Sequence, residues 1–253
     1  MKNETLIKVF EDTMKLVEDG AIETNSSTLK CDFSDINSEE ETETPNIIVS
    51  PLDSVSYIKE NIEGKTCILN MASYKRGGGG VRNGSNAQEE CLFRCSNLFE
   101  TVDQKFYPLK EDECLYTKDA VFFKDFYYNR MDPVIVDVVT IAAINLNKDS
   151  YYDFGANRWV DILEDKDDNY INHTKDKIRL MLSVAEKNNV NTLVLGAWGC
   201  GVFKNDPTEM AEMFKQVLID EKYATKFKKV VFAIINDQNS VDDNYSKFSE
   251  VLN

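Results

Sequence analysis

The sequence predicts an α/β domain whose sheet is largely parallel and has about six strands. Two features support this prediction. Short runs of apolar, β-branched residues alternate with longer segments in which apolar residues recur at helical spacing, and strands joined by crossover helices produce this alternation. Several short runs are apolar at almost every position, as expected for strands buried on both faces. We expect a single domain over residues 1–253, a length that suffices for one well-buried core.

A helix and then a polar loop begin the chain. Leu6, Phe10 and Met14 recur at helical spacing before Gly20, which predicts an N-terminal helix within residues 1–20 that covers one face of the sheet. Residues 22–45 are rich in Ser, Thr, Asn and acids. This composition predicts an acidic, solvated loop of the kind that is often disordered.

The remaining elements alternate in type along the chain. Residues 147–173 are the exception, because they mix aromatic and acidic residues without a clear period beyond a short turn at Trp159–Leu163. We interpret them as a surface insertion bordering the functional site. The predicted strands are 46–50, 66–71, 120–123, 134–140, 192–195 and 229–235, and the predicted helices are 53–62, a helix that begins near 88, 174–187, 207–220 and 245–252.

Charge and cysteine usage limit the partners and the compartment. The net charge of −15 argues against direct binding to duplex nucleic acid, because such binding needs a basic surface. No run of about 18 apolar residues is present, and the amphipathic, acidic N-terminus differs from a signal peptide. The six cysteines are scattered without a CxxC pair, which is typical of reduced thiols. We therefore expect no membrane association and an intracellular, cytoplasmic location, or a nuclear one in a eukaryote.

A glycine-rich stretch lies between a predicted strand and a predicted helix. Gly77–Gly80 are four consecutive glycines that follow the strand 66–71 and precede the helix beginning near Gln88. Glycine lets the backbone turn its N–H groups toward an anion, and a helix N-terminus adds partial positive charge. The stretch is therefore a candidate phosphate cradle, and a flexible turn is the plain structural alternative.

Two adjacent carboxylates, Glu89 and Glu90, stand at the start of that helix. Acids in a first turn also complement the helix dipole, and Ser85 with Gln88, or Asn86 with Glu89, has the spacing of a capping box. The conjunction of an anion cradle and paired acids nevertheless favours a function. It indicates a ligand that carries both a phosphate group and an acid-sensitive bond.

A second glycine-rich loop, Gly196–Gly201, follows the predicted strand 192–195. Its glycine order is GxxGxG, which is not the dinucleotide fingerprint, and no Gly-Lys-Ser/Thr follows, which excludes a nucleotide-hydrolase loop. The next helix has a marked start, with Asp206 at the N-cap position and Pro207 at the first helical position. Two such loops at neighbouring strand ends would hold one diphosphate from both sides, and an ordinary turn is the alternative.

The spacing of the glycines and the acids resembles the signature of a known family. Three glycines, seven residues and Gln-Glu-Glu, here Gly78–Gly80 and Gln88–Glu90, are similar to the signature of the microbial-type poly(ADP-ribose) glycohydrolases, which have a macrodomain fold. The resemblance covers roughly residues 46–235 and includes the motifs NMAS at 70–73, LFRCS at 92–96 and LGAWGCGVF at 195–203.

The resemblance implies a macrodomain-like, three-layer α/β/α fold with a mixed, largely parallel sheet. It also implies an enzyme that needs no cofactor or metal and hydrolyses the ribose–ribose bonds of poly(ADP-ribose). Glu90 would be the general acid and base, and Glu89 would fix the ribose hydroxyls. Because the chain is acidic and the polymer is a polyanion, we expect it to capture mainly terminal units and to release ADP-ribose.

The same resemblance implies a set of residues that bind ADP-ribose. Asp53 would meet adenine, and Phe203 would pack on the distal part of the ligand. The other expected ligand-binding residues are Asn70, Ser73, Gly78, Gly79, Gly80, Val81 and Gln88 around the first loop, and Gly196, Trp198, Gly199, Cys200, Gly201 and Val202 in the second.

One position departs from the family, and two other functions stay open. Arg76 and Gly77 stand where the family usually has Asn-Pro, so we expect the loop to begin more flexibly. The alternatives are hydrolysis of mono-ADP-ribose from a protein or nucleic acid, and ADP-ribose binding without catalysis. His173 lies in a polar, loop-like segment, and Cys91 with Cys95 lacks further ligands, so we expect neither Ser-His catalysis nor a metal site.

Overall fold

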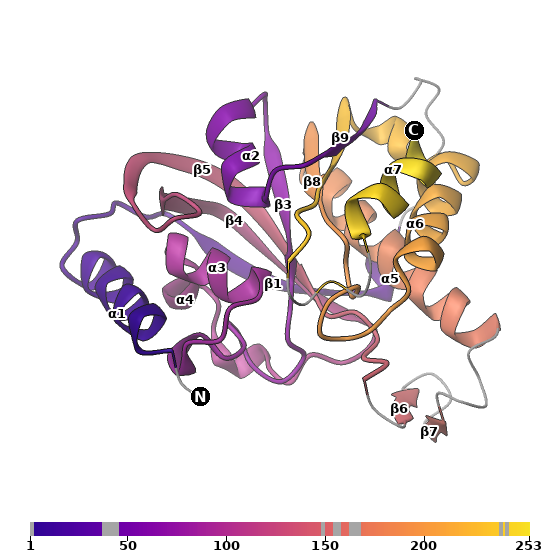
Figure 1. The fold of residues 1–253 in the computed structure, drawn as a ribbon, viewed down its shortest axis with the longest axis horizontal. Helices are drawn as coiled ribbons and strands as arrows, with labels where there is room; N and C mark the ends of the chain where they lie inside the picture. The colour runs from indigo at the N-terminus through magenta and orange to yellow at the C-terminus, as the bar shows by residue number, and fades with distance from the viewer. Residues whose placement is uncertain are drawn as a thin grey trace.

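A seven-stranded sheet runs through the middle of the molecule in the order β1-β4-β5-β3-β8-β9-β2 (Figure 1). The computed structural model describes residues 3–36, 46–147, 150–153, 158–161, 168–237, 240 and 243–253. The strands of the sheet are β1 (Ser27–Asp32), β2 (Ile47–Ser50), β3 (Thr66–Met71), β4 (Glu113–Lys124), β5 (Arg130–Ile141), β8 (Thr192–Leu195) and β9 (Lys229–Ala233). A separate pair, β6 (Ser150–Asp153) and β7 (Arg158–Asp161), is antiparallel.

The sheet is mixed, and its parallel part comprises β5, β3, β8, β9 and β2. The strands β1, β4 and β5 pair antiparallel. This confirms the predicted mixed, largely parallel sheet. Because β3, β8 and β9 run in the same direction, their carboxyl ends meet at one edge, where sheets of this kind bind ligands.

The strand β1 corrects the prediction that residues 22–45 form only a solvated loop. Its side chains are mostly exposed, and Cys31 is the one buried position, so the sequence lacks the apolar alternation that marks a strand. Pairing with the long β4 makes this segment a strand. Residues 37–45 of the predicted loop lie outside the described residues.

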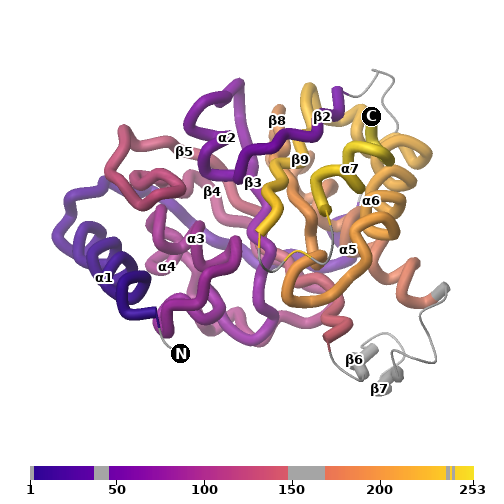
Figure 2. The backbone as a smooth tube through the Cα atoms, in the orientation of Figure 1, coloured from indigo at the N-terminus to yellow at the C-terminus, as the bar shows by residue number. Residues whose placement is uncertain are grey.

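Helices cover both faces of the sheet, which gives the predicted three layers. Alternate strand residues enter two different cores: Leu69 packs with the helices α5 to α7, whereas Ile68 packs with α1 to α4, as the period of a strand requires. Figure 2 shows α1, α3 and α4 on one side of the strands and α5 to α7 on the other. Their bounds are α1 (Glu4–Glu18), α2 (Ser54–Asn61), α3 (Gln88–Cys95), α4 (Leu98–Thr101), α5 (Asp168–Lys187), α6 (Pro207–Lys215) and α7 (Asn244–Leu252).

Several boundaries differ from the prediction. The strands β4 and β5 are longer than expected because they form a hairpin, and α6 continues as a π-helical turn, Gln216–Asp220. The helix α5 begins before residue 174 and contains His173, so the loop-like prediction for this histidine is wrong. The turn predicted at Trp159–Leu163 is also wrong, since β7 occupies part of it. Residues 148–149, 154–157 and 162–167 of the predicted insertion lie outside the described residues.

The cysteines and the lengths of the helices can be compared with the sequence. All six cysteines are free and buried, where a thiol packs as a small hydrophobic group. Within the described ranges, every helix is too short or too polar to cross a bilayer.

Candidate active site

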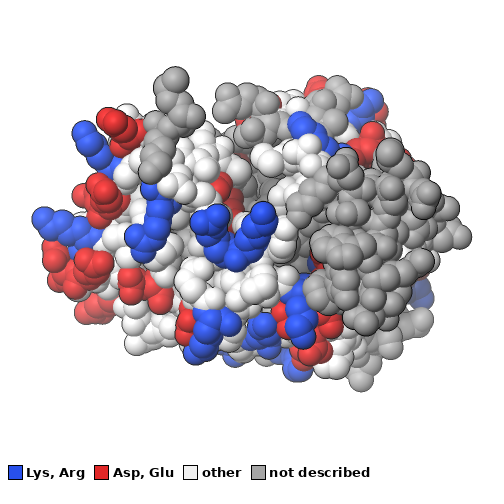
Figure 3. Space-filling view, turned by 90° about the horizontal axis from the view of Figure 1, so that it is seen from below, with Lys and Arg blue, Asp and Glu red and all other residues white. Residues whose placement is uncertain are grey.

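A cavity of about 360 Å³ opens at the carboxyl ends of β3, β8 and β9. Its wall is formed by the start of α3, the loop after β8, the start of α2 and the segment after β9. Figure 3 looks from below the view of Figure 1 and shows acidic side chains beside a hollow near the middle of this face. The acidic residues that line the cavity are Asp53, Glu89, Glu90 and Asp237.

Glu89 is almost completely buried, with 3% of its surface exposed. The backbone N–H of Ser73 donates to its Oε2 at 2.7 Å, and that of Gly78 donates to its Oε1 at 3.2 Å. Burial raises the pKa of Glu89 to about 8, although the bonds from Ser73 and Gly78 lower it, and the neighbouring charge of Glu90 raises it further. This carboxyl group therefore tends to hold a proton near neutral pH.

Asn70 supports Glu89 from behind. Its Nδ2 lies 3.5 Å from Oε1 of Glu89 and 3.3 Å from the hydroxyl of Thr140. Its own Oδ1 is buried without a hydrogen-bond partner among the described residues. The amide nitrogen suits an ionised Glu89 at this position, whereas the amide oxygen would suit a protonated one, because a carboxylate only accepts and a carboxylic acid can donate.

Glu90 has both carboxylate oxygens on backbone donors. Gly80 donates to Oε1 at 2.8 Å and Ala87 donates to Oε2 at 3.0 Å. Ala87 is the N-cap of α3, so the capping boxes predicted from Ser85 and Asn86 are wrong by one or two residues. A glutamate three residues after the N-cap reaches back to its N–H whichever side chain stands there, and Glu90 occupies this position.

Gln88 ties the start of α3 to the end of β3. Its Nε2 donates to the carbonyl of Leu69 at 2.6 Å, and its Oε1 accepts from the backbone N–H of Met71 at 2.9 Å. The amide group matches one acceptor and one donor on the strand. The Gln-Glu-Glu sequence thus holds the helix on the strand with its first residue and presents two carboxylates with the next two.

The glycine loop binds the protein's own acids. The N–H groups of Gly78 and Gly80 donate to Glu89 and Glu90, and that of Gly79 donates to the carbonyl of Arg76. The expectation that this loop offers free N–H groups to a ligand phosphate is therefore wrong for these glycines. A Cβ on Gly79 would lie 2.5 Å from Oε1 of Glu90 and 2.8 Å from Oε2 of Glu89, so only glycine allows this approach.

The start of this loop is held by Gln104. The Gln104 amide accepts from the backbone N–H of Gly77 and donates to its carbonyl, each at 3.2 Å. The greater flexibility expected from Arg76-Gly77 stays a prediction. These two bonds act against it, because they hold Gly77 through both its N–H and its carbonyl.

The second loop has free donors where the first has none. Within the part of the chain that the structure describes, the N–H groups of Gly199, Gly201 and Val202 make no hydrogen bond. All three residues line the cavity. Asn205 holds the loop in place, because its Nδ2 donates to the carbonyl of Gly199 at 3.0 Å and to that of Ile144 at 2.9 Å. Backbone N–H groups without a partner at residues that line a cavity are candidate donors to an anion.

The predicted site residues fall into two groups. One group lines the cavity, and the other lies behind the cavity wall. Trp198 belongs to the lining group, and its Nε1 donates to the carbonyl of Ile141 at 3.1 Å. The lining group is Asp53, Ser73, Gln88, Glu89, Glu90, Trp198, Gly199, Gly201, Val202 and Phe203, and the supporting group is Asn70, Gly78, Gly79, Gly80, Val81, Gly196 and Cys200.

Sequence reasoning missed part of the cavity wall. Phe126 comes from the turn between β4 and β5, and no motif marks it. The residues after β9 could have been found, because β9 was predicted as a strand and parallel neighbours end at the same edge. The missed lining residues in this segment are Ile234, Ile235, Asp237, Ser240 and Asn244.

No cluster of three or more His, Cys, Asp or Glu side chains that could hold a metal ion exists among the described residues. Cys91 and Cys95 pack in the core around α3.

Comparison with known proteins finds a family model that matches the first part of the chain. The family model described as microbial-type PARG, catalytic domain, matches residues 11–129, which include the glycine loop and both glutamates. This confirms the resemblance to the microbial-type poly(ADP-ribose) glycohydrolases. The second loop lies outside the matched residues. No curated protein matches the chain.

Solved glycohydrolase structures show the same fold. The poly(ADP-ribose) glycohydrolase (PARG) of Thermomonospora curvata, bound to the inhibitor ADP-HPD, aligns with a TM-score of 0.80 and 22% identity over 98% of this chain and 99% of that one. The PARG of Deinococcus radiodurans, in complex with ADP-ribose, aligns with a TM-score of 0.71 and 23% identity over 92% and 96% of the two chains. The predicted macrodomain-like fold is confirmed.

Proposed function

We propose that this protein is a poly(ADP-ribose) glycohydrolase that releases ADP-ribose mainly from the ends of the polymer. The observation that carries the proposal is the pair of buried carboxylates, Glu89 and Glu90, held at the cavity wall by backbone N–H groups of Ser73, Gly78, Gly80 and Ala87. The family model that covers this loop and the PARG structures that hold ADP-ribose or an inhibitor support it.

Glu90 is the proposed general acid and base. Glycosidic bonds to ribose break through an oxocarbenium-like transition state, so the leaving oxygen needs a proton and the anomeric carbon needs an activated water. Each Glu90 oxygen accepts one N–H bond and keeps a second lone pair for a proton. The carboxyl group can therefore exchange a proton with the substrate without leaving its two donors, which keeps it oriented.

Glu89 is the proposed partner that fixes the ribose hydroxyls. Burial raises the pKa of Glu89 to about 8, so this carboxyl group tends to hold a proton near neutral pH and can donate a hydrogen bond to a ribose oxygen. Adjacent residues of a helix point about 100° apart. Two separate contacts to one sugar are therefore geometrically reasonable.

The second loop is the proposed holder of the diphosphate. Gly199, Gly201 and Val202 line the cavity, and their N–H groups make no hydrogen bond among the described residues. Phe203 would provide an aromatic face for the distal part of the ligand. Asp53 is proposed to meet adenine. Its carboxylate already caps α2 through the N–H groups of Val55 and Ser56, so an adenine contact would be additional.

The expected partners follow from this chemistry. ADP-ribose and poly(ADP-ribose) on modified proteins are the proposed ligands, and the charge of −15 favours a terminal unit over a long internal stretch. No duplex nucleic-acid binding and no membrane association are proposed. The six reduced, buried cysteines support an intracellular, cytoplasmic location.

The test uses two substrates and one variant. Purified protein is incubated with poly(ADP-ribosyl)ated protein and, separately, with mono-ADP-ribosylated protein, and free ADP-ribose is followed over time. Glu90→Gln, which keeps the size of the side chain and removes its acid, is assayed beside wild type. We expect release from the polymer only, with a loss of at least about 100-fold in the variant.

The other outcomes identify the alternatives. Release from the mono-modified protein would indicate a mono-ADP-ribosyl hydrolase. Binding of ADP-ribose without release from either substrate would indicate a binding module. Equal rates for wild type and Glu90→Gln on the polymer would exclude Glu90 as the acid.

A further inference from the structure

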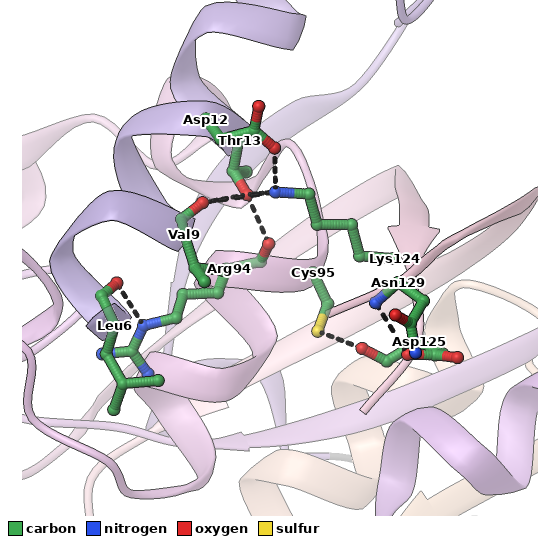
Figure 4. A network of polar contacts seen from close by, with 9 residues as sticks. All are labelled: Leu6, Val9, Asp12, Thr13, Arg94, Cys95, Lys124, Asp125 and Asn129. Carbon is green, nitrogen blue, oxygen red and sulfur yellow. Dashed lines mark hydrogen bonds and ion pairs between the residues drawn. The ribbon is translucent and has the colours of Figure 1, made fainter. Parts of the chain in front are cut away.

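Arg94 is fully buried and makes no ion pair with a carboxylate in the described part of the chain. Its guanidinium joins three separate segments. Nε donates to the carbonyl of Leu6 in α1 at 3.2 Å, one terminal nitrogen donates to the carbonyl of Ser85, and the other lies 3.4 Å from the hydroxyl of Tyr128. Figure 4 shows the Arg94 side chain extending from α3 toward α1.

Burying the Arg94 guanidinium without a carboxylate partner costs free energy. A buried cation loses its hydration, and neutral acceptors compensate for this only in part. A planar guanidinium can, however, fix several carbonyl groups in directions that no apolar side chain can. The placement of Arg94 is therefore better explained by what it orients than by the stability that it adds.

The Ser85 carbonyl belongs to the segment that holds Glu90. The N–H of Ser85 donates to the carbonyl of Gly80 at 3.2 Å. The N–H of Gly80 in turn donates to Glu90, and so does the N–H of Ala87, two residues after Ser85. Ser85 thus lies between the two donors of Glu90, and Arg94 is bonded to its carbonyl.

We propose that Arg94 is a positioning residue for Glu90, which acts by fixing the segment Gly80–Ala87 and with it both donors to the Glu90 carboxylate. This rests on the proposed function, because it assigns Glu90 as the acid. Arg94 lies one helical turn after Glu90 on α3 and belongs to the supporting structure. Its bonds to Leu6 and Ser85 connect α1 to the segment Gly80–Ala87.

The helix α1 is the outer support of this arrangement. The backbone of Asn3, its N-cap, lies against Gly84, where a Cβ would meet the Asn3 carbonyl at 2.4 Å. The carbonyl of Leu6 then accepts from Arg94. The start of α1 therefore packs against the same segment that Arg94 fixes.

Lys124 provides a matched control. It is also buried, and its Nζ holds α1 by donating to the carbonyl of Val9 at 3.2 Å, to Asp12 at 2.7 Å and to Thr13 at 2.7 Å. Figure 4 shows both cationic side chains reaching α1. Unlike Arg94, Lys124 has no hydrogen bond to the segment Gly80–Ala87 in the described residues.

The experiment compares Arg94→Lys, Arg94→Met and Lys124→Met with wild type in the full-length protein. Hydrogen exchange of the Gly80 and Ala87 amides reports the segment directly, and polymer hydrolysis reports catalysis. We expect amide protection at both positions to fall at least about tenfold in both Arg94 variants and to stay unchanged in Lys124→Met. We expect kcat to fall by about 10- to 100-fold in Arg94→Met, with KM within about threefold of wild type.

Arg94→Lys separates orientation from charge. Lysine keeps the charge but lacks the planar fork, so we expect a kcat between those of wild type and Arg94→Met. All three variants are expected to melt at a lower temperature, and each is assayed well below its own midpoint.

Three results would overturn the proposal. One is wild-type amide protection at Gly80 and Ala87 in both Arg94 variants, and another is an equal loss of protection in Lys124→Met. The third is a kcat of Arg94→Met equal to that of Lys124→Met. If wild type releases no ADP-ribose, the proposed function fails, but the amide protection still tests the role of Arg94.

Discussion

The two glycine-rich loops lie on either side of one cavity and use their backbones in opposite ways. The first loop, Gly77–Gly80, gives the N–H groups of Gly78 and Gly80 to the protein's own glutamates. The second loop leaves the N–H groups of Gly199, Gly201 and Val202 unpaired among the described residues. Glycine-rich sequence at a strand end therefore predicts a site for an anion, but it does not tell whether the anion is a ligand or a side chain.

The difference assigns separate tasks to the two sides of the cavity. The first loop fixes the carboxylates that we propose to be catalytic, so changes there should alter turnover and pH dependence. The second loop faces the cavity with polar backbone and with Phe203, so changes there should alter binding. Four predictions test this division, in order of decreasing expected effect on free energy.

The largest effect concerns the pH dependence of stability through Glu89. Burial raises its pKa from 4.5 to about 8. The stabilising contribution of the proton on Glu89 is complete below pH 4.5 and is lost as the pH rises to about 8, because the folded protein keeps a proton that the unfolded chain has released. The free energy of unfolding of wild type, relative to Glu89→Gln, should fall by on the order of 4 kcal/mol across this range.

Chemical denaturation of wild type and Glu89→Gln between pH 5 and pH 9 measures this difference. Glu60→Gln is the control for the loss of one carboxylate, because Glu60 is exposed. A difference between wild type and Glu89→Gln that stays constant across the range would show that Glu89 does not hold a proton in the folded protein.

The next effect is on turnover through Gly79. Alanine there would bring a Cβ to 2.5 Å from Glu90 and 2.8 Å from Glu89, at a residue whose φ is +52°. Both carboxylates must then move, so we expect Gly79→Ala to lower kcat by about 100-fold or more. Steady-state hydrolysis of the polymer provides the measurement.

Gly20→Ala is the matched control for Gly79→Ala. Gly20 also has a positive φ, +69°, but a Cβ there meets nothing within 4 Å. It should share the backbone strain and leave kcat unchanged. Equal activity of the two variants would mean that backbone strain, and not displacement of the acids, is what Gly79 avoids.

A smaller effect is expected from the second loop through Phe203. Its ring lines the cavity, so Phe203→Ala should weaken ADP-ribose binding by about tenfold, or about 1.4 kcal/mol. The kcat should change little, because neither glutamate is touched. Calorimetric titration with ADP-ribose measures the affinity. Phe33→Ala is the control, since Phe33 is also partly buried against the same core and is not among the residues lining the cavity.

The smallest effect separates two helix caps. Asp53 caps α2 and lines the cavity, whereas Asp206 caps α6 and does not line it. Replacing either by alanine should lower the free energy of unfolding by about 1 kcal/mol. Only Asp53→Ala should weaken ADP-ribose binding, by about threefold for one lost hydrogen bond. If Asp53→Ala and Asp206→Ala bound ADP-ribose with equal affinity, Asp53 would act only as the cap of α2.

Motifs and periodicity in the sequence determined much of this protein. The alternation of apolar runs and helical segments predicted the strands β2, β3, β8 and β9 and most helices, because burial on both faces leaves a clear apolar signal. The Gln-Glu-Glu motif after the glycines located both acids. Asp206 was predicted as the cap of α6, and the structure confirms it with bonds from Thr208 and Glu209.

Other structural features depend on tertiary contacts that local sequence patterns do not predict. The strand β1 exists because β4 pairs with it, although its side chains are mostly exposed. The second donor to Glu90 is the N–H of Gly80, which the glycine loop brings to the start of α3. Phe126 reaches the cavity from a hairpin turn, and Arg94 bonds to Leu6, which is 88 positions away in the chain.

The physical reason lies in the range of each interaction. Helical and strand periodicity, caps and glycine turns act between residues close in sequence, so the sequence displays them directly. The direction of a backbone N–H group, the burial that raises the pKa of Glu89 and the partners of Arg94 depend on segments that only the folded chain brings together. The sequence by itself therefore located the two glutamates and the two glycine-rich loops, and the tertiary structure decided which residues line the cavity and which lie behind its wall.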